Sequence, residues 1–229
     1  MKYVYNYPRP MVTVDMALLR YHQSKIEILL IQRDRSPFMG RWALPGGFIE
    51  MEETLLESAC RELEEETGLK NIHLFPLFPQ GDPGRDPRGR TITLVYGGIV
   101  TPPFPEISAG DDARNAQWFS IESLPLLAFD HDNIIKKTIE IIQSQAFWNV
   151  KFLEFFPEQF DLDDLKKLSN ILFSDNAYTS PLLKIATTLD LIQEKEAGKF
   201  EKTEKGLLVK DLSFKKISKQ WIDLINKID

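Results

Sequence analysis

The sequence predicts an α/β domain followed by a smaller C-terminal domain in which helices precede a β-ribbon. The first observation is a pair of β-rich runs at 11–21 and 25–33, which are followed by a helical segment at 54–67. The second observation is the order helix, helix, ribbon after residue 160, which is the order of a winged helix-turn-helix module.

The third observation is a change in composition along the chain. All ten arginines lie between Arg9 and Arg114, whereas the segment from Lys151 onward uses only lysine as its strongly basic residue. We therefore expect two domains, at 1–148 and 149–229.

The N-terminal elements follow from strand propensity and turn residues. The two β-rich runs are separated by a short polar turn at 22–24, so they are expected to form a hairpin. The segment RWALPGG at 41–47 predicts a short strand leading into a Pro-Gly-Gly turn. At this turn Gly46 and Gly47 would let the backbone approach a ligand closely.

The helix at 54–67 is followed by Gly68, which is placed to end it as a C′ glycine. The segment HDNIIKKTIEIIQSQAF, at 131–147, has helical periodicity. Further strands are expected at 71–78, 91–100 and 115–120.

The C-terminal domain is expected to contain helices at 161–173, 180–192 and 215–228. Asp161 is the expected N-cap of the first, and Ser180 is that of the second, with Pro181 at N1. The charged segment at 194–209 predicts a β-ribbon that turns at Gly198.

Bulk properties restrict the class of protein. The net charge of −6 argues against non-specific coating of nucleic acid. The N-terminus lacks the unbroken apolar segment of a signal peptide, and no later stretch reaches membrane-spanning length, so we expect a cytoplasmic protein with no membrane partner. The only cysteine, Cys60, is expected to be a small core side chain.

The segment RELEEETGL, at 61–69, concentrates acidic side chains on one helix. Glu62, Glu65 and Glu66 stand at i, i+3 and i+4, so their carboxylates share a face. The opposite, apolar stripe consists of Leu56, Ala59 and Leu63. Because like charges repel, a cation should compensate them, and carboxylates with substrate phosphates are a usual environment for Mg²⁺. Arg61 can brace the cluster without neutralising it; the alternative is a solvated acidic face.

The spacing of these residues resembles the signature of the Nudix hydrolase superfamily. The matching positions are Gly47, Glu53, Arg61, Glu62, Leu63, Glu65, Glu66, Gly68 and Leu69. The resemblance implies an α/β/α sandwich with a mixed sheet and Mg²⁺- or Mn²⁺-dependent hydrolysis of a nucleoside diphosphate linked to another group. It also implies metal ligation by Glu62, Glu65 and Glu66. Arg61 and Glu53 would orient the loop and the helix.

The reaction that this resemblance implies is attack by an activated water on a phosphorus of the diphosphate. Candidates for the general base are Glu62, Glu106, Asp111 and Asp112. For the last three, the alternative is an ordinary acidic residue in a loop. Glu64, on another face of the helix, is expected to be solvated.

A second cluster lies in the loop GRDPRGR, which brings Arg85, Arg88 and Arg90 close together. The planar fork of arginine suits phosphate oxygens, so this loop is expected to bind an anionic part of the substrate. The alternative is a solvated loop.

The longer pattern YPRPMVTVD, GRWALPGGF, RDPRGRT, AGDDA and FDH (129–131) resembles one branch of the superfamily. This branch contains bacterial ADP-ribose pyrophosphatases and the Nudix-related regulators of NAD metabolism (NrtR type), with a C-terminal winged-helix domain. It implies hydrolysis of ADP-ribose to AMP and ribose 5-phosphate, and a homodimer.

The choice between enzyme and regulator depends on both domains. The complete set of acids favours a hydrolase. DNA binding is disfavoured because the expected recognition helix offers Lys184 but no arginine, and also carries Asp190. From Lys151 to Asp229 there are 13 lysines against 14 acidic residues, a net charge of −1. The alternative functions are an ADP-ribose- or sugar-sensing repressor, or a protein whose acidic helix holds only a structural cation.

Overall fold

The computed structural model describes residues 6–110, 113–148, 150–175 and 178–208. The helix expected at 215–228 lies outside the described residues. The chain divides into two compact units, and the second combines the chain from Ile139 onward with Arg20–Glu27 and Ile99–Phe104. A division between residues 148 and 149 stays a prediction.

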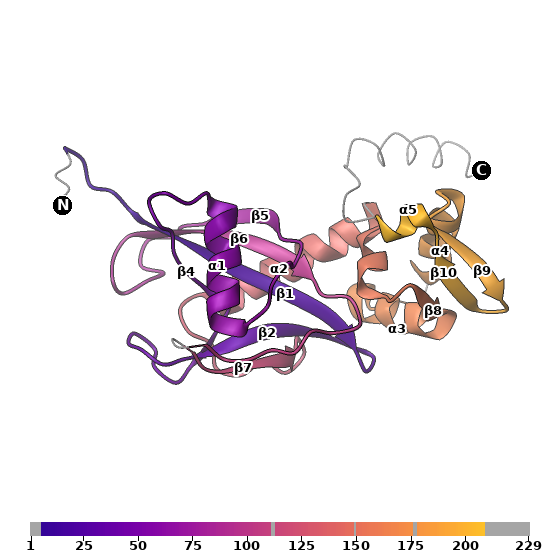
Figure 1. Ribbon diagram of the computed structural model, residues 1–229, viewed down its shortest axis with the longest axis horizontal. Helices are drawn as coiled ribbons and strands as arrows, with labels where there is room; N and C mark the ends of the chain where they lie inside the picture. Colours follow the sequence, from indigo (N-terminus) through magenta and orange to yellow (C-terminus); the bar gives the residue numbers. More distant parts are fainter. Residues whose placement is uncertain (1–5, 111–112, 149, 176–177, 209–229) are drawn as a thin grey trace. The chain divides into compact units, whose positions relative to one another are not determined.

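A seven-stranded mixed sheet supports the first unit (Figure 1). Its strands are β1 (Met11–His22), β2 (Lys25–Arg33), β3 (Trp42–Ala43), β4 (Gly46–Phe48), β5 (Phe75–Gln80), β6 (Thr91–Ile99) and β7 (Ala113–Ser120). The order is β3-β2-β1-β6-β5, with β4 paired to β1 and β7 paired to β2. The expected neighbours β1 and β2 are confirmed, and β5 begins later than the sequence predicts.

Two helices accompany the sheet, and Figure 1 shows α1 (Leu55–Thr67) in front of the strands and α2 (His131–Trp148) behind them. Strands β1 and β2 supply much of the core, because consecutive side chains, which point to both faces of each strand, are buried. These include Val14, Met16, Leu18, Ile28 and Leu30. The α/β architecture expected from the sequence is therefore confirmed.

The sequence correctly predicts both ends of α1. Thr54 is the N-cap and forms a capping box with Glu57. Gly68 ends the helix at φ 72°, and its N–H donates to the carbonyl of Glu64.

The expected apolar stripe of α1 is only partly correct. Ala59 and Leu63 are buried, whereas Leu56 is 46% exposed because it lies in the first turn, before the buried face of the helix begins at Ser58. The expectation that Cys60 is a core residue is wrong. Cys60 is exposed because one residue along a helix turns the side chain about 100° away from buried Ala59.

The second unit has the element order of a winged helix. It contains the 3-10 helix η1 (Lys151–Phe155), β8 (Gln159–Asp161), α3 (Leu162–Phe173), α4 (Thr179–Thr188), β9 (Ile192–Glu196), β10 (Lys199–Lys202) and α5 (Glu204–Leu207). Strands β9 and β10 form the expected ribbon, with Gly198 at φ 77° in its turn, and β8 pairs with β10. Within the described residues, no helix combines the length and the apolar character needed to cross a membrane.

Helices α3 and α4 begin in different ways. Asp161 caps α3 as expected, since its side chain accepts from the N–H of Asp164. Helix α4 instead begins at Thr179, after Tyr178 and without a side-chain cap, so the expectation that Ser180 is an N-cap is wrong. It also ends at Thr188, because the chain continues into β9 rather than extending the helix to residue 192.

Candidate active site

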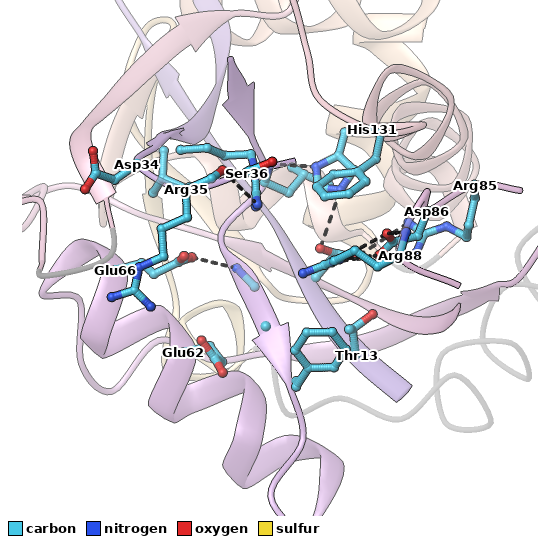
Figure 2. A pocket seen from close by; sticks show the side chains of 18 of the residues that line it. Thr13, Asp34, Arg35, Ser36, Glu62, Glu66, Arg85, Asp86, Arg88 and His131 are labelled. Carbon is cyan, nitrogen blue, oxygen red and sulfur yellow. Dashed lines mark hydrogen bonds and ion pairs between the residues drawn. The ribbon is translucent and has the colours of Figure 1, made fainter. Parts of the chain in front are cut away.

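A pocket of about 340 Å³ lies in the first unit, where α1, β4 and the loops after β2 and β5 meet. The pairing of β4 with β1 fixes one wall, because Asp15 lies opposite Gly46 and Val14 lies opposite Gly47. Figure 2 shows Glu62 and Glu66 on the α1 side of the pocket and the pair Asp86–Arg88 across from them. The Pro-Gly-Gly turn and the acidic helix that the sequence singled out therefore line one pocket.

Glu66 is a buried carboxylate of the pocket, at 9% exposure. Its Oε2 accepts one hydrogen bond, of 2.8 Å, from the backbone N–H of Gly46. Burial, and to a smaller extent the charges of Glu62 and Asp15, raise the pKa of Glu66 to about 8 despite this hydrogen bond. A negative charge on Glu66 is thus undercompensated by the protein.

Glu62 lies directly against the backbone of Gly47. A Cβ at residue 47 would be only 2.3 Å from Oε1 of Glu62, so any side chain there would displace the carboxylate. The Glu62 side chain is 14% exposed and also receives a hydrogen bond of 2.8 Å from Nη1 of Arg61. Gly47 therefore provides the space that the carboxylate occupies.

Arg61 joins the helix to the preceding loop. Its Nε donates to Oε1 of Glu53 at 2.8 Å, and its Nη2 donates to Oε2 of Glu53 and to the Phe48 carbonyl. The same Nη1 that donates to Glu62 also donates to Glu65, at 3.1 Å. One guanidinium consequently fixes the loop, β4 and two of the acids, which is the orienting geometry expected for Arg61 and Glu53.

The three predicted metal ligands are not equivalent. Glu62 and Glu66 line the pocket, whereas the Glu65 side chain is 58% exposed at its edge. Throughout the described part of the chain, no group of three His, Cys, Asp or Glu side chains is arranged to hold a metal ion. The donors nevertheless fit Mg²⁺ or Mn²⁺, because one or two carboxylates plus substrate phosphates are the usual Mg²⁺ environment. The undercompensated Glu66 is the observation that supports this fit.

Glu64 behaves as expected for a solvated residue of the same helix. Its side chain is 49% exposed and pairs with Lys70 at 2.6 Å, away from the pocket-lining residues. Of the candidate bases in the loop between β6 and β7, Glu106 is exposed and does not line the pocket. Asp111 and Asp112 lie outside the described residues.

The three arginines of the loop after β5 have three different environments. Arg85 has a 5% exposed side chain, and its Nη2 pairs with Asp130 at 2.7 Å. Arg88 is 36% exposed and pairs with the buried Asp86, also at 2.7 Å. Arg90 does not line the pocket, and its Nη1 donates to the carbonyl of Gly81. Arg88 is thus the arginine of this loop that presents a partly open guanidinium to the pocket.

His131 is a pocket residue that the sequence analysis placed only within the longer family pattern. It is buried, and its Nδ1 accepts a hydrogen bond of 2.9 Å from the N–H of Leu44. Burial lowers its pKa, so the neutral ring carries its proton on Nε2, which lies 3.7 Å from Oδ1 of Asp15. His131 thereby ties the start of α2 to the wall that carries Gly46.

Arg33 is a pocket residue that the sequence did not single out, and Phe129, like His131, stood out only within the longer family pattern. Arg33 lies at the end of β2, and its guanidinium stacks 4.9 Å from the centroid of the Phe129 ring. The sequence around them gives no pattern of its own, since Arg33 is the last residue of a strand and Phe129 lies in a loop. Their place in the pocket reveals them as a pair.

The basic side chains of the second unit are mostly engaged by acids of the same unit. The pairs are Lys166–Asp163, Lys167–Asp164, Lys195–Glu201, Lys199–Glu196 and Lys205–Asp190. Lys202 is buried and donates to the carbonyl of Phe156 at 2.6 Å. Among the described lysines after residue 150, exposed Lys184 has no carboxylate within ion-pair distance.

Comparisons with known proteins show the family of the chain. Residues 9–140 match the NUDIX domain family. The ADPR responsive transcriptional repressor NtrR of Acinetobacter baylyi is 30% identical over 203 residues, which are 85% of this chain and 80% of that protein. An ADP-ribose pyrophosphatase of Methanocaldococcus jannaschii is 45% identical over 130 residues, which are 57% of this chain and 73% of the relative.

A solved structure extends the similarity beyond the matched domain. Shewanella oneidensis NrtR, in complex with a 27mer DNA, superimposes with a TM-score of 0.71 and 26% identity. The match covers 83% of this chain and 92% of that one.

Proposed function

Since the chain belongs to the NUDIX family, we propose that it is a divalent-metal-dependent hydrolase that cleaves ADP-ribose to AMP and ribose 5-phosphate. The observation that carries this proposal is the pair Glu62 and Glu66, two carboxylates that face one pocket beside a glycine turn. The 45% identity to an ADP-ribose pyrophosphatase supports the choice of substrate.

In the proposed reaction a water oxygen attacks one phosphorus of the diphosphate, and the bond from that phosphorus to the bridging oxygen breaks. A bound Mg²⁺ or Mn²⁺ would supply Lewis-acid stabilisation of the phosphate oxygens. Glu62, Glu65 and Glu66 would hold the metal, and Glu62 would also accept the proton of the water. Arg61 and Glu53 would keep these carboxylates in position.

The N–H of Gly46 has a separate role in this arrangement. It holds Oε2 of Glu66 at 2.8 Å, which leaves the other carboxylate oxygen for the cation. Gly47 then allows the substrate and Glu62 to approach the same stretch of backbone. Arg85, in contrast, is engaged by Asp130 and would serve as part of the pocket wall, and Arg90 would not touch the substrate.

The test is release of AMP and ribose 5-phosphate from ADP-ribose by purified protein with Mg²⁺, and loss of that release with EDTA. We expect Glu62→Gln and Glu66→Gln to lower kcat by at least about 100-fold, because each removes a charged metal ligand. Glu64→Gln is the matched control on the same helix and should retain activity within about twofold. Equal activity of all three variants would contradict the proposed site.

A repressor that senses ADP-ribose is the second candidate, because the relative named as an ADPR responsive repressor matches both units of the chain. The ion pairs of the second unit argue against it, since their lysines already face acids and DNA affinity depends on neutralising phosphates. A promoter fragment that shifts at physiological salt, and is released by ADP-ribose, would support the regulator. The expected homodimer stays a prediction that sedimentation would test.

A further inference from the structure

Two guanidinium groups lie over the same aromatic ring in the pocket. The Cζ atom of Arg33 is 4.9 Å from the centroid of Phe129, and that of Arg88 is 5.4 Å from it. All three residues line the pocket. The two guanidinium charges repel one another, and Asp86 pairs directly only with that of Arg88.

Within the described residues Arg33 makes no ion pair, and the carboxylates of Glu66, Asp86 and Asp15 offset its charge only from a longer distance. Its Nε donates to the Pro37 carbonyl at 2.9 Å, and its Nη2 donates to the Arg35 carbonyl at 3.4 Å. No carboxylate of the described chain lies within ion-pair distance of it. Burial, and next the charge of Arg88, lower the pKa of Arg33. A half-buried guanidinium held only by carbonyls remains available to a negatively charged ligand.

Arg88 is fixed in place rather than mobile at the surface. Its Nε and Nη2 donate to the carboxylate of Asp86, at 3.0 and 2.7 Å, and Asp86 is 4% exposed. The same guanidinium stacks 4.9 Å from the ring of Phe48. Within the described residues its Nη1 has no hydrogen bond, so one edge of the fork remains for a ligand.

Phe129, the ring that both arginines approach, has an unusual backbone conformation. Its φ is 53°, a left-handed value that is uncommon for a large side chain. Its ring also makes an edge contact with Phe38, at 4.9 Å between centroids. Such backbone strain persists where the surrounding structure requires it, and it concentrates at functional sites.

We propose that Arg33 and Arg88, stacked on Phe129, form a two-arginine clamp that binds non-bridging oxygens of one phosphate of the substrate diphosphate. This proposal rests on the proposed function, because it assumes that the pocket binds a diphosphate. The second phosphate would then lie toward Glu62 and Glu66, across the pocket from Arg88 (Figure 2). Guanidinium forks match phosphate oxygens in a bidentate geometry that an ammonium group cannot reproduce.

The clamp is tested with Arg33→Lys and Arg88→Lys, which keep the charge and remove the fork. Arg41→Lys is the matched control for the first, because Arg41 also stacks on an aromatic ring, that of Phe38 at 5.2 Å, but does not line the pocket. Arg90→Lys is the matched control for the second, from the same loop. Circular dichroism and thermal unfolding of each variant would verify that it folds.

The first measurement is steady-state hydrolysis of ADP-ribose with Mg²⁺. We expect each clamp variant to raise KM about 10- to 100-fold, and to change kcat by less than about 3-fold, because the lost bonds bind the ground state and transition state alike. Both controls should keep KM within about twofold. Clamp variants that match their controls, or that lose kcat at unchanged KM, would overturn the proposal.

The second measurement is calorimetric titration with ADP-ribose and with inorganic pyrophosphate in EDTA, which requires no catalysis. Weaker binding by the clamp variants than by their controls supports the clamp even if the wild-type protein hydrolyses nothing. Hydrolysis by the wild-type protein, with clamp variants that bind and react as their controls do, retains the enzyme and excludes the clamp. Failure of both ligands to bind the wild-type protein in EDTA, with no effect of either variant on KM, also excludes it.

Discussion

Replacing Gly47 with alanine tests whether the position of the Glu62 carboxylate controls the reaction. The new Cβ would lie 2.3 Å from Oε1 and 2.4 Å from Cδ of Glu62, whereas ordinary van der Waals contact begins at 3.4 Å. Gly47 has no positive φ, so its backbone accepts alanine and the carboxylate has to move. The required displacement is about 1 Å, and a misplacement of this size at an active site can cost about 100-fold in rate.

We expect kcat for Mg²⁺-dependent release of AMP from ADP-ribose to fall about 100-fold in Gly47→Ala. Stability should fall by only about 1 kcal/mol, because the displaced atoms are the end of a side chain rather than backbone. Gly81→Ala is the matched control: its Cβ would lie 3.2 Å from Ile92, and residue 81 does not line the pocket. A Gly47→Ala protein with wild-type kcat would refute the inference that Glu62 must lie against residue 47.

Three further predictions concern other parts of the chain. Arg61→Lys should lower kcat about 10-fold or more, because one ammonium group cannot hold Glu53, Glu62 and Glu65 together. The control is Arg114→Lys, which alters an exposed ion pair with Asp34, and equal kcat values of the two variants would contradict the role of Arg61. Phe155→Ala, at a fully buried position, should lower the free energy of unfolding by about 3 to 5 kcal/mol in urea titrations, and a loss below about 1 kcal/mol would contradict its core role. Burial lowers the pKa of Lys202 from 10.5 to about 8, so between these pH values the folded state binds fewer protons than the unfolded state. The free energy of unfolding should therefore rise with pH across that window, by roughly 3 kcal/mol. Urea titrations at pH 7 and 10 should show this rise in the wild type but not in Lys202→Met, and identical pH dependence of the two proteins would rule it out.

Local chemistry explains which parts of the fold the sequence could predict. The ends of α1 were predictable because Thr54 and Gly68 act on backbone groups within a few residues of themselves. The start of α4 was not predictable from Ser180 and Pro181, because the observed helix begins one residue earlier without any side-chain cap. Packing, rather than a local signal, sets that boundary.

The candidate site shows the same division. Helical spacing was sufficient to place Glu62 and Glu66 toward a common ligand, since their relation depends on one helix alone. It could not show that Glu65 would be the most exposed of the three acids, because this depends on how α1 lies against the sheet.

The roles of the pocket arginines could not be predicted from the sequence, because each role depends on the contacts that the folded chain provides. Arg85 and Arg88 are three residues apart and belong to one charged loop, but their partners are Asp130 and Asp86. The partner of Arg85 is 45 residues away, and it converts a candidate ligand-binding residue into part of the pocket wall. Arg33 was overlooked because it ends a largely buried strand, where a basic residue gives no pattern of its own.

The distribution of ion pairs also affects how well each of the two units could bind an anion. Exposed ion pairs such as Lys199–Glu196 contribute only about 0 to 1 kcal/mol each, so DNA phosphates could displace the acids at small cost. The displaced carboxylates would still remain beside the phosphates, however, and would repel them. Arg33 has a different environment, because it is half-buried and its hydrogen bonds go to backbone carbonyls rather than to a carboxylate, which leaves it available to an anion. The pocket of the first unit thus presents guanidinium groups together with carboxylates that could hold a cation, which is why we expect recognition of a diphosphate there to be stronger than at the ribbon of the second unit.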